Sequence, residues 1–141
     1  MVERTLSNED MQRIRVATAI TKADIIDCVE IDDKIIFVVS KGFLGIAIGK
    51  DARNIGRLRD VFKKGVKFVE FDQDEKKFVA NLFKPFNVEE VTIEKVGNKT
   101  VAKVKVLQRE KSKVIGKNGK NVQLAKVLAR RHSSVDEIQI L

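Results

Sequence analysis

The chain has very few of the residues that build disulfides, metal cages and aromatic binding surfaces. Its 141 residues include one Cys, one His, one Pro and no Trp or Tyr. One Cys excludes an internal disulfide framework and a thiolate zinc cage, and one His excludes a multi-histidine metal site. No apolar run approaches the ~20 residues that a membrane-spanning helix needs, and the polar N-terminus does not look like a signal peptide. We therefore expect a cytoplasmic protein with no membrane partner, no small-molecule substrate and no cofactor.

Basic side chains are in excess and unevenly spread. The chain carries 28 Lys and Arg against 20 Asp and Glu, a formal net charge of +8. Residues 74–141 hold 15 basic and 8 acidic side chains, whereas residues 1–73 hold 13 and 12. One basic cluster lies between Lys50 and Lys67 and another between Arg109 and Lys120. Such clusters are typical of polyanion-binding surfaces, although a solvated helix face can have the same composition.

The two clusters occupy equivalent positions in an internal repeat. Shifting the chain by 67 residues aligns Ile48-Gly49-Lys50 with Ile115-Gly116-Lys117, and Asn54 with Asn121. This offset predicts two copies of one unit, residues 1–73 and residues 74–141. Because units of this size bury little surface alone, we expect them to pack together as one rigid body.

Each copy is predicted to follow the order helix, strand, strand, helix, loop, helix, strand. Ser7 and Asp74 are the expected N-caps of the two opening helices. Runs of β-branched residues around 32–33 and around 97–98 predict two hairpins. The alternation in 101–106 predicts that its even-numbered residues face the core. The expected fold class is α+β (mixed α/β), with one three-stranded sheet per copy covered by helices on one face.

The most specific feature is the loop Gly116-Lys117-Asn118-Gly119. Glycine permits unusual backbone angles and lets a ligand approach the backbone closely. The helix after the loop directs free N–H groups and the positive end of its dipole toward that ligand. Lys117 and Lys120 add cationic charge, and no nucleophile or general base accompanies them. The pattern predicts a loop that holds phosphate groups, and it does not predict an enzyme.

The segment around this loop carries a family resemblance. Val114-Ile-Gly-Lys-Asn-Gly-Lys-Asn-Val122, continuing Gln-Leu-Ala125, resembles the core of a KH domain with its GxxG loop, and the order of elements resembles the type II KH fold. This sequence is similar to the second KH domain of NusA-family transcription factors. The segment from Gly45 to Arg53 is similar to the first KH domain of that family. The whole chain resembles the short archaeal type of NusA, which is made of two tandem KH domains. The resemblance implies a non-enzymatic factor that binds single-stranded RNA and acts with RNA polymerase in elongation, pausing or termination.

The resemblance also implies which residues bind RNA. The loops grip the RNA backbone, apolar groove residues face the bases, and basic residues on the rim contact phosphates. In the second copy these residues are Lys113, Val114, Ile115, Gly116, Lys117, Asn118, Gly119, Lys120, Asn121 and Val122. In the first copy they are Gly45, Ile48, Gly49, Lys50, Asp51, Ala52, Arg53 and Arg57, with Ile46 and Ile55 on the groove floor.

The first loop departs from the family pattern. Ala52 stands where the last glycine belongs, and Asp51 adds an acid inside the loop. The Ala52 methyl group hinders close approach of a backbone, and the Asp51 carboxylate repels phosphate. We therefore expect the second copy to grip RNA more tightly than the first.

Other interpretations use the same residues. RNA binding could serve ribosome assembly or translation, the grooves could be protein-interaction surfaces without RNA, or a loop could be only a connector. A phosphate-binding NTPase loop at 45–51 is disfavoured because three residues, not four, separate its glycines and Asp follows the lysine. Cys28 is expected to be a buried, inert thiol, His132 a helix-end cation, and Asp32 and Asp33 turn residues.

Overall fold

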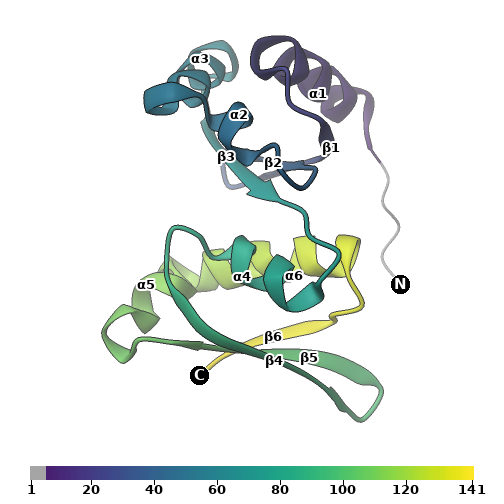
Figure 1. Cartoon of the computed structure of the whole chain (residues 1–141), viewed down its shortest axis with the longest axis vertical. Helices are drawn as coiled ribbons and strands as arrows, with labels where there is room; N and C mark the ends of the chain where they lie inside the picture. The colour runs from purple at the N-terminus through teal and green to yellow at the C-terminus, as the bar shows by residue number, and fades with distance from the viewer. Residues whose placement is uncertain (1–5) are drawn as a thin grey trace. The chain divides into compact units, whose positions relative to one another are not determined.

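The computed structural model describes residues 6–141, which form two compact units (Figure 1). We call residues 6–71 the N-terminal unit and residues 72–141 the C-terminal unit. The division falls after Phe71, two residues before the boundary that the sequence suggested. Asp72 belongs with the following helix because its carboxylate accepts a hydrogen bond from the Asp74 N–H (2.9 Å).

Both units have the element order that the sequence predicts. The N-terminal unit contains α1 (Asn8–Thr21), β1 (Ile25–Ile31), β2 (Lys34–Val39), α2 (Leu44–Ile48), a single 3-10 turn (Lys50–Ala52), α3 (Arg53–Phe62) and β3 (Gly65–Glu70). The C-terminal unit contains α4 (Glu75–Leu82), β4 (Val88–Val96), β5 (Lys99–Val106), α5 (Lys111–Ile115), a 3-10 turn (Lys117–Gly119), α6 (Lys120–His132) and β6 (Glu137–Ile140), with a further 3-10 turn at Gln108–Glu110.

Each unit is built on one three-stranded sheet. The first two strands pair antiparallel, and the third pairs parallel to the second, so the orders are β1-β2-β3 and β4-β5-β6. The helices of each unit lie on one side of its sheet (Figure 1). The predicted mixed α+β class with one helix-covered sheet per copy is therefore confirmed.

Local sequence signals explain where the first elements begin and turn. The Ser7 hydroxyl accepts a hydrogen bond from the Asp10 N–H (3.0 Å), and Asp10 reaches back to the Ser7 N–H (3.3 Å). Asp74 caps α4 by accepting from the Lys76 N–H (3.0 Å). Asp32 and Asp33 form the first hairpin turn with φ of 51° and 62°, values that Asp tolerates better than most residues.

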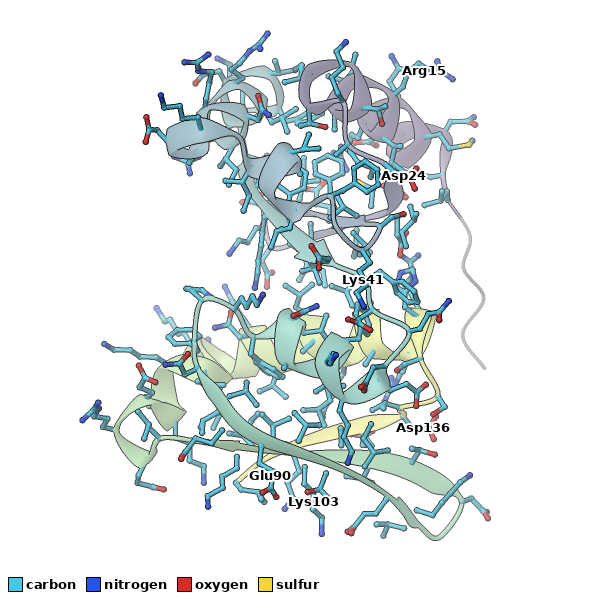
Figure 2. All side chains as sticks on the ribbon, in the orientation of Figure 1. Arg15, Asp24, Lys41, Glu90, Lys103 and Asp136 are labelled. Atoms are coloured by element: carbon cyan, nitrogen blue, oxygen red, sulfur yellow. The ribbon has the colours of Figure 1, made fainter. Side chains whose placement is uncertain are left out.

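The central strands β2 and β5 differ in the residues on the face of the sheet that points away from the helices. In β5, Ala102, Val104 and Val106 are buried and alternate with more exposed residues, as predicted. Glu90 and Lys103 lie on the side of this sheet away from α4 and α6 (Figure 2). In β2, five consecutive apolar residues, 35–39, leave no polar alternation. The N-terminal sheet is thus apolar on both faces at its central strand.

The repeat offset of 67 holds from α2 through the loop but not to the end of the unit. Lys34 pairs with Gly65 in the N-terminal sheet, and its equivalent Val101 pairs with Glu137 in the C-terminal sheet. The third strands are therefore related by a larger offset, because α6 has 13 residues and α3 has 10, and because the connection from α6 to β6 is also longer than that from α3 to β3. Among the helices described, none has the length and apolar character that crossing a membrane would require.

Candidate nucleic-acid interface

The loop of the C-terminal unit is a sharp connection between α5 and α6. Gly116 ends α5 with φ 82° and ψ 165°, a conformation that is nearly restricted to glycine. Asn118 (φ 58°) and Gly119 (φ 73°) are both left-handed. The Gly116 N–H donates to the Ser112 carbonyl and the Gly119 N–H donates to the Gly116 carbonyl, both at 3.0 Å. The chain thereby reverses within four residues and presents 117–118 to solvent.

A side-chain hydrogen bond of Asn121 behind the loop, which we call the buttress, explains why Gly116 must be glycine. The Asn121 side-chain amide donates to the Lys113 carbonyl (3.1 Å), which ties the start of α6 to α5. A Cβ atom on Gly116 would lie 2.9 Å from the Asn121 backbone nitrogen and 3.0 Å from its side chain. Asn121, expected among the RNA contacts, thus has a structural task inside the loop for its amide group.

The loop of the N-terminal unit has the same backbone path despite its different residues. Gly49 has φ 78° and ψ 167°, and Asp51 and Ala52 are left-handed with φ of 56° and 58°. The Asn54 amide donates to the Ile46 carbonyl (3.0 Å), which repeats the C-terminal buttress. Ala52 therefore does not alter the loop shape, but it holds a conformation that costs an L-residue about 1–2 kcal/mol.

Most predicted contact residues are accessible, with one exception. The exposed side chains in the C-terminal unit are Lys113, Lys117, Asn118, Lys120 and Asn121, and Ile115, Gly116, Gly119 and Val122 are partly exposed. Those exposed in the N-terminal unit are Gly45, Ile46, Lys50, Asp51, Ala52, Arg53 and Arg57, and Ile48, Gly49 and Ile55 are partly exposed.

Val114 is the exception, and the structure corrects its place in the groove. Its side chain is fully buried, so it packs in the core of the C-terminal unit and cannot line a binding surface. The equivalent Ala47 is fully buried as well. In both five-residue helices this position is buried, whereas the next residue, Ile115 or Ile48, is partly exposed.

A shallow hollow of about 370 Å³ runs beside the C-terminal loop. It brings together four predicted residues, Ile115, Asn118, Gly119 and Val122. It also contains five that the sequence did not single out: Gln123, Lys126, Ile138, Gln139 and Ile140. We call this hollow the C-terminal groove, with the loop and α6 as one wall and β6 as the other.

The β6 wall offers backbone groups because β6 is an edge strand. The Leu141 N–H donates to the Val104 carbonyl (2.8 Å), so the odd-numbered residues of this segment direct their backbone groups toward β5. Backbone direction alternates along a strand. The N–H and C=O groups of Ile138 and Ile140 therefore face the open edge, next to the apolar groove.

Glu137 controls the charge at the far end of the groove. Its carboxylate binds Lys126 (3.1 Å) and Arg130 (2.8 Å), with Lys99 at 4.0 Å. The hydrogen bond from Lys126 is the main reason that the pKa of the Glu137 carboxyl lies below its usual range. Lys126 is therefore a groove residue whose charge is already compensated by the protein.

Comparison with known proteins agrees with this geometry. Residues 75–140 match the model of the NusA-like second KH domain, and residues 11–73 match the KH domain model. A relative from Methanococcus vannielii, named "Probable transcription termination protein NusA", is 38% identical over 96% of this chain and 79% of its own length. The relative of the same name from Thermoplasma acidophilum is 34% identical over 99% of this chain and 97% of its own. The chain belongs to the NusA family.

A solved structure supports the same assignment for the fold. The chain named "Crystal structure of APE1850" superposes with a TM-score of 0.82 at 30% identity, covering 96% of this chain and 100% of that one. The predicted resemblance and the predicted organisation as two tandem KH domains are thus confirmed.

A second hollow, of about 560 Å³, lies at the opposite end of α6. Its lining residues are Asn98, Lys99, Arg130, Ser133, Val135, Asp136 and Glu137. Although it is larger, its main charges already satisfy one another: Arg130 donates to the Asp136 carbonyl and to Glu137, both at 2.8 Å. It lies away from the glycine loop, so the C-terminal groove remains the candidate site.

The other singled-out residues have structural roles. Cys28 is buried, and burial is the main cause that raises the pKa of its thiol to about 12, as expected of an inert core cysteine. His132 is the last residue of α6 and lies edge-on to Phe78, with ring centroids 6.0 Å apart. Within residues 6–141, no group of three or more His, Cys, Asp or Glu side chains is placed to hold a metal ion.

Proposed function

We propose that this NusA-like chain is a non-enzymatic, single-stranded RNA-binding factor that acts on transcription termination or pausing. In this proposal the C-terminal loop grips the backbone of nascent RNA and the groove beside it holds the bases. The observation that carries the proposal is the conjunction of an exposed glycine-hinged loop, surrounding lysines and an apolar groove with an open strand edge.

The loop is suited to phosphate because its tip has backbone donors that the protein leaves unused. Lys117 and Asn118 lie in the turn directly before α6, and the first N–H groups of a helix have no acceptor within the helix. Both residues are exposed, and Lys113 and Lys120 add positive charge on either side. Backbone amides and cations together are the groups that bind phosphate oxygens.

The groove is suited to unpaired bases for a different reason. Ile115, Val122 and Ile140 are partly exposed and give an apolar floor for base faces. The edge-facing backbone groups of 138 and 140 can pair with base edges, as in KH domains that clamp about four nucleotides of a single strand. From Gly119 to Lys126, α6 extends over about 10 Å, a length that suits a few nucleotides.

The role in transcription rests on the relatives, which are named as transcription termination proteins. RNA polymerase is therefore the proposed protein partner. Copurification of the tagged chain with RNA polymerase would support this role, whereas copurification with ribosomal subunits would contradict it.

The direct test replaces the loop tip with acids. Lys117→Asp combined with Asn118→Asp should weaken binding of a short fluorescein-labelled single-stranded RNA by more than about tenfold, because it removes one cation and adds two anions at the backbone contact. Binding is measured by fluorescence anisotropy across a salt series, and circular dichroism checks the fold.

The matched control is Lys95→Asp with Asn98→Asp, which makes the same chemical change at exposed positions of the β4–β5 hairpin. It should lose much less affinity. Equal losses of RNA affinity in the two variants would mean that the loss comes from the change in net charge and not from the loop. If the wild-type protein shows no salt-dependent RNA binding, the proposed function is contradicted and a protein-interaction role is favoured.

A further inference from the structure

Helix α3 contains a glycine that the protein itself does not need. Gly56 lies in the interior of α3 with helical, not positive, φ, and nothing lies within 4 Å of the position that its Cβ would occupy. Glycine destabilises a helix interior relative to alanine. Neither a turn nor close packing inside the chain therefore explains this residue.

The repeat shows where Gly56 lies. Its equivalent in the C-terminal unit is Gln123, which lines the C-terminal groove. Ala52 precedes Gly56 by four residues, as Gly119 precedes Gln123, so both positions follow the loop by one helical turn. Gly56 thus has on α3 the place that Gln123 has on α6, and we call the corresponding face of the N-terminal unit the N-terminal groove. The helix is partly exposed at Gly56, and the space at its Cβ position is open.

The neighbouring cation differs between the grooves as well. Lys126 is bound to Glu137 at 3.1 Å, but its equivalent Arg59 has no acid in that place, because β3 begins with Gly65 where β6 begins with Glu137. Among residues 6–141, Arg59 makes no side-chain ion pair or hydrogen bond, and it is exposed. It follows Gly56 by three residues on the same side of α3.

We propose that the N-terminal groove holds an RNA base between the α3 backbone at Gly56 and the guanidinium of Arg59. The inference rests on the proposed function and deepens it, since it gives the N-terminal unit a base contact in spite of its weaker loop. Glycine lets the flat base approach the helix, and a planar guanidinium stacks on a base where an ammonium group cannot.

Two substitutions in the full chain test this arrangement, which we call the base sandwich. One changes the α3 backbone position and the other changes the guanidinium. Gly56→Ala should raise Tm by about 2–4 °C through helix propensity and yet weaken RNA binding several-fold, because the methyl group displaces the base. Arg59→Lys should weaken binding similarly while leaving the slope of log K against log salt unchanged, since the charge is kept. The probe is a short single-stranded RNA with 2-aminopurine, whose fluorescence reports stacking.

Val61→Ala is the matched control. Val61 is 54% exposed and lies 140° around α3 from Gly56, and alanine is again the better helix former. It should raise Tm without changing RNA affinity. If Gly56→Ala and Arg59→Lys both bind RNA like wild type while the acidic variant of the C-terminal loop fails to bind, the base sandwich is wrong and the proposed function stands. If the acidic variant binds normally, the proposed function itself fails.

Discussion

The two loops reach one backbone conformation from different residues. The angles of Asp51 (φ 56°, ψ 33°) and Asn118 (φ 58°, ψ 26°) are nearly the same, and so are those of the two hinge glycines. The residues that agree are the first glycine, the lysine after it and the asparagine five positions after the glycine. The amide of that asparagine ties the two helices together. The comparison teaches that the hinge and the buttress set the loop shape, while the remaining residues set strain and charge.

The two units also place their acids differently. In the N-terminal unit Glu30 binds Arg13 (2.7 Å) and Lys64, and the hydrogen bond from Lys64 is the main cause that lowers the pKa of the Glu30 carboxyl. In the C-terminal unit the corresponding network is centred on Glu137 and includes the groove residue Lys126. Arg59, the equivalent of Lys126, has no such acidic partner on β3, which begins with Gly65 where β6 begins with Glu137.

The largest effect is expected at the hinges. Gly116→Ala should lower the free energy of unfolding by about 3 kcal/mol, because alanine is strained at these angles and its methyl group meets a backbone atom. Gly49→Ala should cost less, since the nearest atom, at 2.9 Å, is the Asn54 side-chain nitrogen, which can move more easily than backbone. Urea denaturation of both variants measures the difference, and an equal or reversed cost would refute the steric argument.

Much of this architecture could be predicted because its signals are local. The Ser7 and Asp74 caps, the two hairpins and the inward residues of β5 follow from neighbouring residues and strand alternation. The loops could be found because their glycines and lysines recur at one offset. Such local signals can be read from the sequence because they do not depend on how the rest of the chain packs.

The missed parts depend on tertiary packing. A five-residue helix is too short for its periodicity to separate buried Val114 from partly exposed Ile115. The second groove wall, Ile138 to Ile140, was missed because the repeat offset changes after the longer α6, and because the sheet order decides which strand is the edge. The Lys126–Glu137 pair was missed for the same reason, since it joins a helix to that strand.

Exchanging the middle residues of the loops should shift RNA affinity in opposite directions. Asn118→Asp gives the C-terminal loop the native N-terminal residue, and Asp51→Asn does the reverse. One unit charge near a phosphate in water is worth about 1 kcal/mol, so we expect a loss of about fivefold in the first and a smaller gain in the second. Anisotropy at low and high salt measures both, and the difference should shrink as salt rises. A loss in both variants would show that the residue's shape, not its charge, matters.

Removing either buttress should have similar effects on the two units. Asn121→Ala and Asn54→Ala each delete one neutral hydrogen bond, worth about 1 kcal/mol. Amide hydrogen exchange should become faster at Gly116 and Gly119 in the first variant and at Gly49 and Ala52 in the second. Asn98→Ala, at the exposed end of a hairpin, is the control and should leave both loops unchanged. Unaltered exchange in the loops would mean that the buttress does not hold them.

The smallest effect on the free energy of unfolding is expected at the last loop position, Ala52 or Gly119. Here the direction of the change tests the argument. Ala52→Gly relieves left-handed strain of about 1–2 kcal/mol but gives the unfolded chain more freedom, so a net stabilisation of about 0.5 kcal/mol remains. Gly119→Ala should destabilise, although nothing lies within 4 Å of its Cβ position, because only the backbone angle opposes it. Thermal and urea unfolding of the two variants give the signs. If Ala52→Gly destabilised the chain, the alanine would not be strained in its left-handed conformation, and any effect of Ala52 on RNA binding would have to come from its methyl group hindering the approach of the RNA backbone.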